Sequence, residues 1–216
     1  MNNENGIYLY DKINIKKCFF ESPSTAEWII RPELSKAHLG IQDRDLDYEK
    51  KIQLQPHSIY LSFTSDVKVG VTRKSQVPTR WIDQGAIEAI EIAELPNRHF
   101  AGICEIELKK YFKDKTNWRT MLTTNKSNVD LSIKKNECYP VLPEEAKNYF
   151  LSKSKTLKIN YPISNEIITP KSLNIKKTKT FSGKLIGIKG QYLIFEDSTV
   201  FNVRSNEGLV VNIKID

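Results

Sequence analysis

Two short β-rich runs, separated by three polar residues, constrain the fold of this 216-residue chain more than any other feature. They lie within residues 57–72, HSIYLSFTSDVKVGVT, and the break between them is Thr64, Ser65 and Asp66. Apolar and β-branched residues on both sides of so short a polar turn are typical of a β-hairpin. We therefore predict an antiparallel pair of strands here.

The residues after the hairpin complete a compact unit over residues 57–122. Pro78 suits the first turn of a helix, and TRWIDQGAIEAI continues it until Gly85 marks an end or a break. A third apolar run, IEAIEIAEL, is followed by FAGICEIELKKYFKD, in which apolar residues recur at helical spacing with lysines on the other face. The order strand, strand, helix, strand, helix predicts an α+β unit.

The rest of the chain divides into three further parts. We expect an N-terminal segment of short elements at 1–56, a basic linker with a short helix at 123–180, and a C-terminal β unit at 181–216. In the last part, β-rich runs alternate with turn dipeptides, which favours four short antiparallel strands in a meander or barrel. The predicted fold class is therefore α+β: a small mixed sheet flanked by helices, plus this C-terminal four-stranded unit.

Composition narrows the class of protein. With 39% hydrophobic and 27% charged residues, the chain can bury a core and is not disordered. Its three cysteines, Cys18, Cys104 and Cys138, form no CxxC pair, so the sequence supports neither a disulfide framework nor a zinc site made of cysteines. The start, MNNENGIYLYDKIN, lacks the basic residues of a signal peptide, and no apolar run reaches membrane-spanning length. We expect a cytoplasmic protein with no membrane partner.

Positive charge is concentrated toward the C-terminal end. The net charge is +7, and the stretch from Lys147 to Lys189 holds ten lysines against the single acid Glu166. This asymmetry favours a polyanionic partner, DNA or RNA. Taken alone, the charge is better explained by a lysine-rich solvated surface.

Residues 57–122 also carry side chains that suit phosphodiester hydrolysis, which needs an activated water, a cation at the developing charge and a group that holds the phosphate. Their order along the two strands and two helices resembles that of GIY-YIG nucleases. Serine stands in place of the first glycine of the signature, and lysine in place of the second tyrosine. The matching positions are Ser58-Ile59-Tyr60, Lys68-Val69-Gly70, Arg80 and Glu105.

The resemblance implies a catalytic role for four of these residues. Tyr60 would position or deprotonate the attacking water, and Lys68 would lend positive charge. Arg80 would clamp the scissile phosphate, and Glu105 would hold Mg²⁺. Singly, three of them have a structural explanation: Tyr60 as a half-buried strand tyrosine, Arg80 as a packing or salt-bridge arginine, and Glu105 as a solvated helix glutamate. Convergence on one cleft would favour the nuclease, whereas a buried Arg80–Glu105 pair would favour a structural role.

Three functions follow from these features. The first is metal-dependent hydrolysis of DNA or RNA by the GIY-YIG-like unit. The second is a non-catalytic module that keeps the fold and binds nucleic acid, including ribosomal RNA, through phosphate contacts and stacking. The third, a scaffold that docks proteins on its C-terminal β unit, leaves the clustered lysines unexplained. The residues predicted to contact nucleic acid are Arg73, Lys74, Lys176, Lys177 and Lys179.

A second resemblance is longer, and covers about residues 18–208. The segments QPHSIYLSFTSDVKVGVTRKSQVPTRWIDQGA, PNRHFAGICEIELKK, DKTNWRTML and GKLIGIKGQYLIF together resemble the uncharacterised bacterial domain-of-unknown-function family 2797. That family supplies no activity to carry over, so the resemblance implies kinship alone.

Many members of that family carry cysteines in an N-terminal, zinc-binding segment. Here the corresponding stretch keeps Cys18 and His38, while Trp28 and Ser35 stand where cysteines would be expected. Because a structural zinc site needs four ligands, we predict no zinc. We expect the segment to be held instead by apolar packing on the central unit, through Trp28, Ile29, Ile30 and Leu34.

Overall fold

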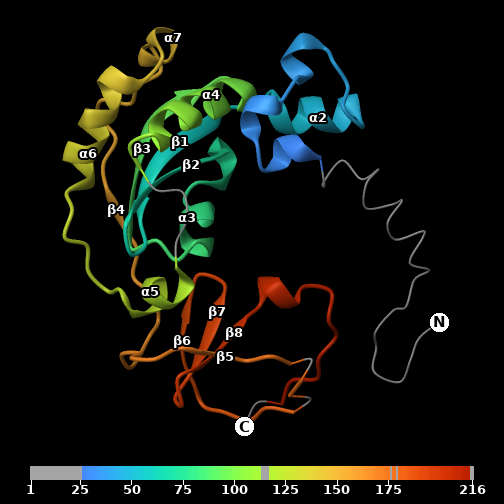
Figure 1. Ribbon diagram of the computed structural model, residues 1–216, viewed down its shortest axis with the longest axis vertical. Helices are drawn as coiled ribbons and strands as arrows, with labels where there is room; N and C mark the ends of the chain where they lie inside the picture. The colour runs from blue at the N-terminus through green and yellow to red at the C-terminus, as the bar shows by residue number, and fades with distance from the viewer. Residues whose placement is uncertain (1–25, 113–116, 176, 179, 215–216) are drawn as a thin grey trace.

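The computed structural model describes residues 26–112, 117–175, 177–178 and 180–214 (Figure 1). It is an α+β protein with two four-stranded sheets and several helices. The domain boundaries drawn from the sequence stay predictions, and Cys18 lies outside the described residues.

The first sheet has the order β2-β1-β3-β4. Its strands are β1 (His57–Phe63), β2 (Val67–Arg73), β3 (Glu88–Leu95) and β4 (Leu157–Lys158). The hairpin expected around residues 64–66 joins β1 to β2. We expected a mixed sheet, but each of its pairings is antiparallel, because a hairpin joins β1 to β2 and β3 returns along the other side of β1.

Side chains of β1 alternate between the two faces of this sheet, as the period of a strand requires. Ile59, Leu61 and Phe63 belong to the main core, together with residues of α4 (Arg98–Lys109) and α6 (Leu131–Cys138). Tyr60 packs on the opposite side in a smaller cluster with Trp81, which lies on α3 (Thr79–Asp83). Helices α4 and α3 therefore flank the sheet from opposite faces, on either side of its edge strand β2.

The second sheet has the order β5-β8-β7-β6. Strands β6 (Leu185–Lys189), β7 (Tyr192–Phe195) and β8 (Thr199–Asn202) form the expected antiparallel run. The fourth strand differs from the prediction: it is β5 (Lys171–Ser172), which precedes the C-terminal unit and pairs parallel to β8. Its two residues are too few to give a sequence pattern.

Three contacts fasten the second half of the chain to the end of α3. The Tyr161 hydroxyl donates to the carbonyl oxygens of Ile82 and Ala86, at 3.1 and 2.9 Å. A Cβ on Gly190, in the turn between β6 and β7, would meet the Asp83 carbonyl oxygen at 3.0 Å. Met121 of α5 (Trp118–Thr123) packs against Gly85. The helix that carries Arg80 is thus held by residues far along the chain.

The N-terminal segment packs against α4. It consists of the 3-10 turns η2 (Glu27–Ile29), η3 (Pro32–Leu34) and η4 (Ala37–Leu39), then α2 (Leu46–Gln53). Trp28 is buried, as expected, and Ile29 and Leu34 are half-buried. The expectation was wrong for Ile30, which is 78% exposed. The turn η2 buries Trp28 and ends at Ile29, and Ile30 follows it with its side chain directed away from the core.

The remaining described elements are short. They are the 3-10 turns η5 (Lys74–Gln76), η6 (Tyr139–Val141) and η7 (Arg204–Asn206), and the helix α7 (Glu144–Lys147) in the stretch where a short helix was expected.

Candidate functional site

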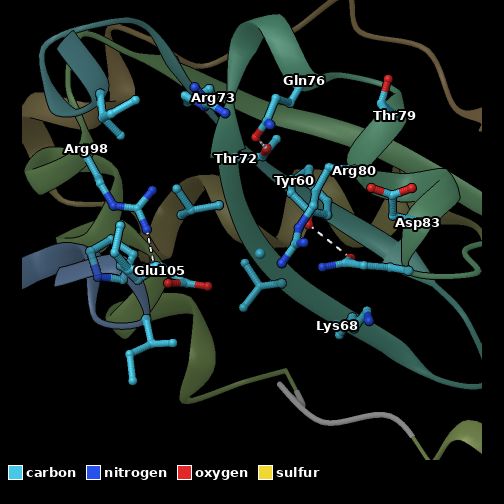
Figure 2. Close-up of a pocket in the computed structure, with 18 of the residues that line it drawn as sticks. Tyr60, Lys68, Thr72, Arg73, Gln76, Thr79, Arg80, Asp83, Arg98 and Glu105 are labelled. Carbon is cyan, nitrogen blue, oxygen red and sulfur yellow. Dashed lines mark hydrogen bonds between the residues drawn. The ribbon is translucent and has the colours of Figure 1, made fainter. Parts of the chain in front are cut away.

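A cleft of about 520 Å³ lies over the edge strand β2. Figure 2 shows Glu105 and Arg98 on one side of this strand, and Tyr60, Arg80 and Asp83 on the other. The N-terminal segment and the C-terminal unit also contribute to the walls. Six basic side chains line the cleft against the two acids Asp83 and Glu105; the basic residues are Lys68, Arg73, Arg80, Arg98, Lys109 and Arg204. This excess of positive charge suits an anionic ligand.

Tyr60 reaches the cleft by crossing β2. It is paired with Gly70 in the register of the two strands, and a Cβ on Gly70 would stand 2.8 Å from Tyr60 Cζ. The Tyr60 hydroxyl donates a hydrogen bond to Gln84 Oε1 at 3.1 Å. Burial raises the pKa of Tyr60 to about 12, against the opposing effect of the Arg80 guanidinium. Tyr60 is therefore a neutral phenol near pH 7.

Lys68 lies on β2, two residues before Gly70, and is half-buried. Burial and then the positive charge of Arg80 lower the pKa of its ammonium to about 8. Within the described part of the chain, no carboxylate forms an ion pair with Lys68 or Arg80. Both cations are thus available to an anion in the cleft.

Glu105 lies on α4 and is 8% exposed. Burial raises the pKa of its carboxyl group, whereas Lys109 and Arg98 act in the opposite direction. Its ion pair is with Lys109, one helical turn later, at 3.5 Å between Nζ and Oε1. Glu105 therefore does not form the buried pair with Arg80 that would have indicated a structural role.

Arg98 was missed by the sequence analysis. Its guanidinium donates to the carbonyl oxygens of Trp28 and Ile29, at 3.1 and 2.6 Å, and lies 5.7 Å from the centre of the Trp28 ring. It stands at the start of α4, whose first turn is capped by Asn97 through a hydrogen bond from Phe100 N. The motif Asn97-Arg98 predicts a helix start, but no local pattern indicates that the arginine binds a segment seventy positions earlier.

The structure brings together five of the predicted site residues and leaves the others elsewhere. Tyr60, Lys68, Arg73, Arg80 and Glu105 all line the cleft. Lys74 instead pairs with Glu91 and Glu94 of β3, at 2.7 and 3.1 Å. Lys177 is exposed outside the cleft, and Lys176 and Lys179 lie outside the described residues.

The fit of the cleft to a metal ion rests on Glu105. Among the described residues, no group of three or more His, Cys, Asp or Glu side chains gathers as a metal site. A buried carboxylate at a cleft wall nevertheless suits Mg²⁺, which is commonly bound by one or two carboxylates and completes its shell with water and phosphate oxygens. His38, a remaining zinc-ligand candidate, stacks on His99 with ring centres 4.3 Å apart.

The lengths of the helices and the comparisons with known proteins both bear on the class of this protein. Within the described residues, no helix is both long enough and apolar enough to cross a membrane. No curated protein and no solved structure matches the chain. A family model described as "Protein of unknown function (DUF2797)" matches residues 4–211, so the chain belongs to that family.

Proposed function

We propose that this DUF2797 protein is a metal-dependent nuclease, in which residues 57–122 form a GIY-YIG-type domain that hydrolyses phosphodiester bonds in DNA or RNA. The observation that carries the proposal is the shared cleft. Tyr60, Lys68, Arg80 and Glu105 come from four different elements, in the order of the nuclease signature, and all line it. Four residues with separate structural roles would not be expected to line one cleft.

The cationic side chains would bind the scissile phosphate. Arg80 presents a planar guanidinium, which matches two phosphate oxygens at once. Lys68 adds a second charge from the strand beneath. Arg73 and Arg204 extend the positive lining, so that phosphates next to the scissile one would also contact a cation.

Proton transfer is better suited to Lys68 than to Tyr60. The most effective general base has a pKa near the working pH, and the pKa of Lys68 is about 8 whereas that of Tyr60 is about 12. We therefore assign to the neutral amine of Lys68 the removal of a proton from the attacking water, so that Arg80 alone holds the phosphate during this step. Tyr60, fixed by its hydrogen bond to Gln84, would orient that water.

Glu105 is the residue that would hold the metal ion. Mg²⁺ supplies positive charge to the phosphate when bound. The Lys109 ammonium, 3.5 Å from the Glu105 carboxylate, occupies this position in the described structure and would have to withdraw.

A cleavage assay tests the proposal. Labelled single- and double-stranded DNA and RNA would be incubated with Mg²⁺ or Mn²⁺, and wild type compared with Glu105→Gln and Arg80→Ala. Glu107→Gln is the matched control, because Glu107 lies on the same helix and pairs with Lys110 outside the cleft. We expect both cleft variants to lose cleavage while unfolding like wild type, and the control to keep it. Unchanged cleavage by Glu105→Gln would refute the assignment.

The second candidate is a non-catalytic nucleic-acid-binding module. It is favoured by the Lys109–Glu105 ion pair, which already neutralises the carboxylate, and by the burial of Tyr60, which is 1% exposed. Such a module would bind nucleic acid and would cleave none of the substrates. That affinity would fall steeply with salt, because counterion release drives it, and would survive Glu105→Gln.

A further inference from the structure

One wall of the cleft is apolar, beside the cationic side chain of Arg98. This wall comes from the N-terminal segment and α2, outside the residues that carry the nuclease signature. Its members are Ile29, Ile30, Pro32, Tyr48 and Ile52. A ligand that is only an anion would make no favourable contact with such a surface. The lining therefore indicates a ligand with an apolar part as well as a charged one.

The apolar wall is firmly attached to α4. Arg98 donates to the carbonyl oxygens of Trp28 and Ile29, and His99 Nδ1 lies 2.8 Å from the Glu33 carbonyl oxygen. Gly102, one turn further along α4, lets η3 approach closely, since a Cβ there would stand 2.5 Å from the Pro32 carbonyl carbon. The wall is therefore a fixed part of the cleft.

Ile30 is the exposed member of this wall. Its side chain is 78% exposed while it lines the cleft, whereas its neighbour Trp28 is buried. Tyr48, half-buried beside Trp28 with ring centres 6.4 Å apart, adds an aromatic side chain to the same wall. Exposed apolar surface next to charged side chains is typical of a binding site.

We propose that the apolar wall is a nucleobase subsite, so that the nucleic-acid strand bound in the cleft is unpaired there. This inference rests on the proposed function, which places the phosphate at Arg80 and Lys68. The base of an adjoining nucleotide then lies against Ile30 and Tyr48. In a duplex the bases are stacked and paired inside the helix, so only an unpaired or extruded base can reach such a wall. A cleft of about 520 Å³ has the size of a pocket for a small organic group.

Binding of three matched probes tests the subsite. They are a fluorescently labelled thymidine homopolymer, the same backbone without bases, and the homopolymer paired with its complement. These three probes are DNA, and a uridine homopolymer serves as the RNA version of the first. Wild type would be compared with Ile30→Ser at low salt and without metal. Leu39→Ser is the control, because Leu39 is exposed in the same segment but does not line the cleft.

We expect wild type to bind the unpaired strand about tenfold more tightly than either the base-free backbone or the duplex, a difference of about 1.4 kcal/mol, because a base that stacks on an aromatic side chain such as Tyr48 gains free energy of this order. Ile30→Ser should lose most of that preference and keep its affinity for the base-free backbone, whereas Leu39→Ser should match wild type. Equal affinity for the unpaired strand and the base-free backbone would overturn the subsite and leave the nuclease proposal standing. Failure to bind any probe would overturn both.

Discussion

Tyr60 lies directly across Gly70, with its hydroxyl oxygen 2.7 Å from the place where a Cβ of residue 70 would be. The two residues are opposite each other on β1 and β2. Because glycine has no Cβ, the phenol crosses the edge strand and brings its hydroxyl to Gln84 in the cleft. Gly70 thus has a physical role that its place in a motif does not reveal.

Gly70→Ala should therefore displace the Tyr60 ring. We expect a loss of about 1–3 kcal/mol in the free energy of unfolding, the usual cost of overpacking, together with a fall in cleavage rate. Denaturant unfolding and the cleavage assay measure the two effects. In a Tyr60→Ala background the same substitution should cost little, because the obstructing ring is gone. Costs that simply add would show that the contact is not the cause.

Lys68 should make anion binding depend on pH. The pKa of Lys68 is about 8 in the folded protein, so the affinity for an oligonucleotide should fall as the pH rises through and above this value. Because the bound phosphate raises the pKa of the ammonium, the midpoint of this fall in affinity should lie above that of the free protein. Lys68→Arg keeps its charge and should show no such fall. Fluorescence anisotropy titrations across this range measure the effect, and identical pH profiles for the two proteins would contradict it.

The same pKa predicts the sign of a stability effect. The unfolded chain has the ordinary lysine pKa of 10.5, above the folded value of about 8. Between these pH values the unfolded state holds more protons, so this group makes the free energy of unfolding increase with pH. Denaturant unfolding of wild type and Lys68→Met across that window should show a steeper increase for wild type.

Lys109 should compete with a metal ion for Glu105. Removing its ammonium by Lys109→Met should strengthen Mn²⁺ binding about two- to fivefold, as expected from a partly exposed ion pair worth at most about 1 kcal/mol. Lys110→Met is the control, since Lys110 pairs with Glu107 instead. Calorimetric titration without nucleic acid gives the affinities. Equal tightening in both variants would indicate a general charge effect.

Gly102→Ala should destabilise the protein, although alanine normally favours a helix interior by about 0.5–1 kcal/mol. The new methyl group would collide with the backbone of η3, at Glu33 N and the Pro32 carbonyl carbon, which cannot move aside as a side chain can. We expect the N-terminal segment to detach, detected by faster proteolysis and a change in Trp28 fluorescence. Ile103→Ala, at a partly exposed position of the same helix, should leave both unchanged.

The sequence predicted those parts of the molecule that depend on local pattern. Alternation in residues 57–72 fixes which side of the sheet each side chain faces, and so places Tyr60 opposite the main core. The four signature positions converge because the elements β1, β2, α3, β3 and α4 follow one another within residues 57–109.

Contacts between distant segments were not predictable in this way. Arg98 lies in the cleft because it binds carbonyl groups of η2, and Arg204 because the C-terminal unit packs beside α3. Carbonyl acceptors are present at every residue, so they give no sequence signal. Lys74 was predicted to contact nucleic acid, but its ammonium pairs with Glu91 and Glu94 on β3, which lie far along the chain.

The outer edge of β3 has a consequence for the newly made chain. Its partners are Tyr149, Phe150, Leu151 and β4, so residues 96–149 must be translated before that edge can be covered. At a translation rate of about 5–20 residues per second, the outer edge of β3 therefore stays unpaired for about 3–11 s. Glu88, Glu91 and Glu94 recur along β3, and charged side chains oppose pairing with a neighbouring chain. Glu88, whose partner Lys158 is made only later, would thus help to protect the nascent chain from aggregation.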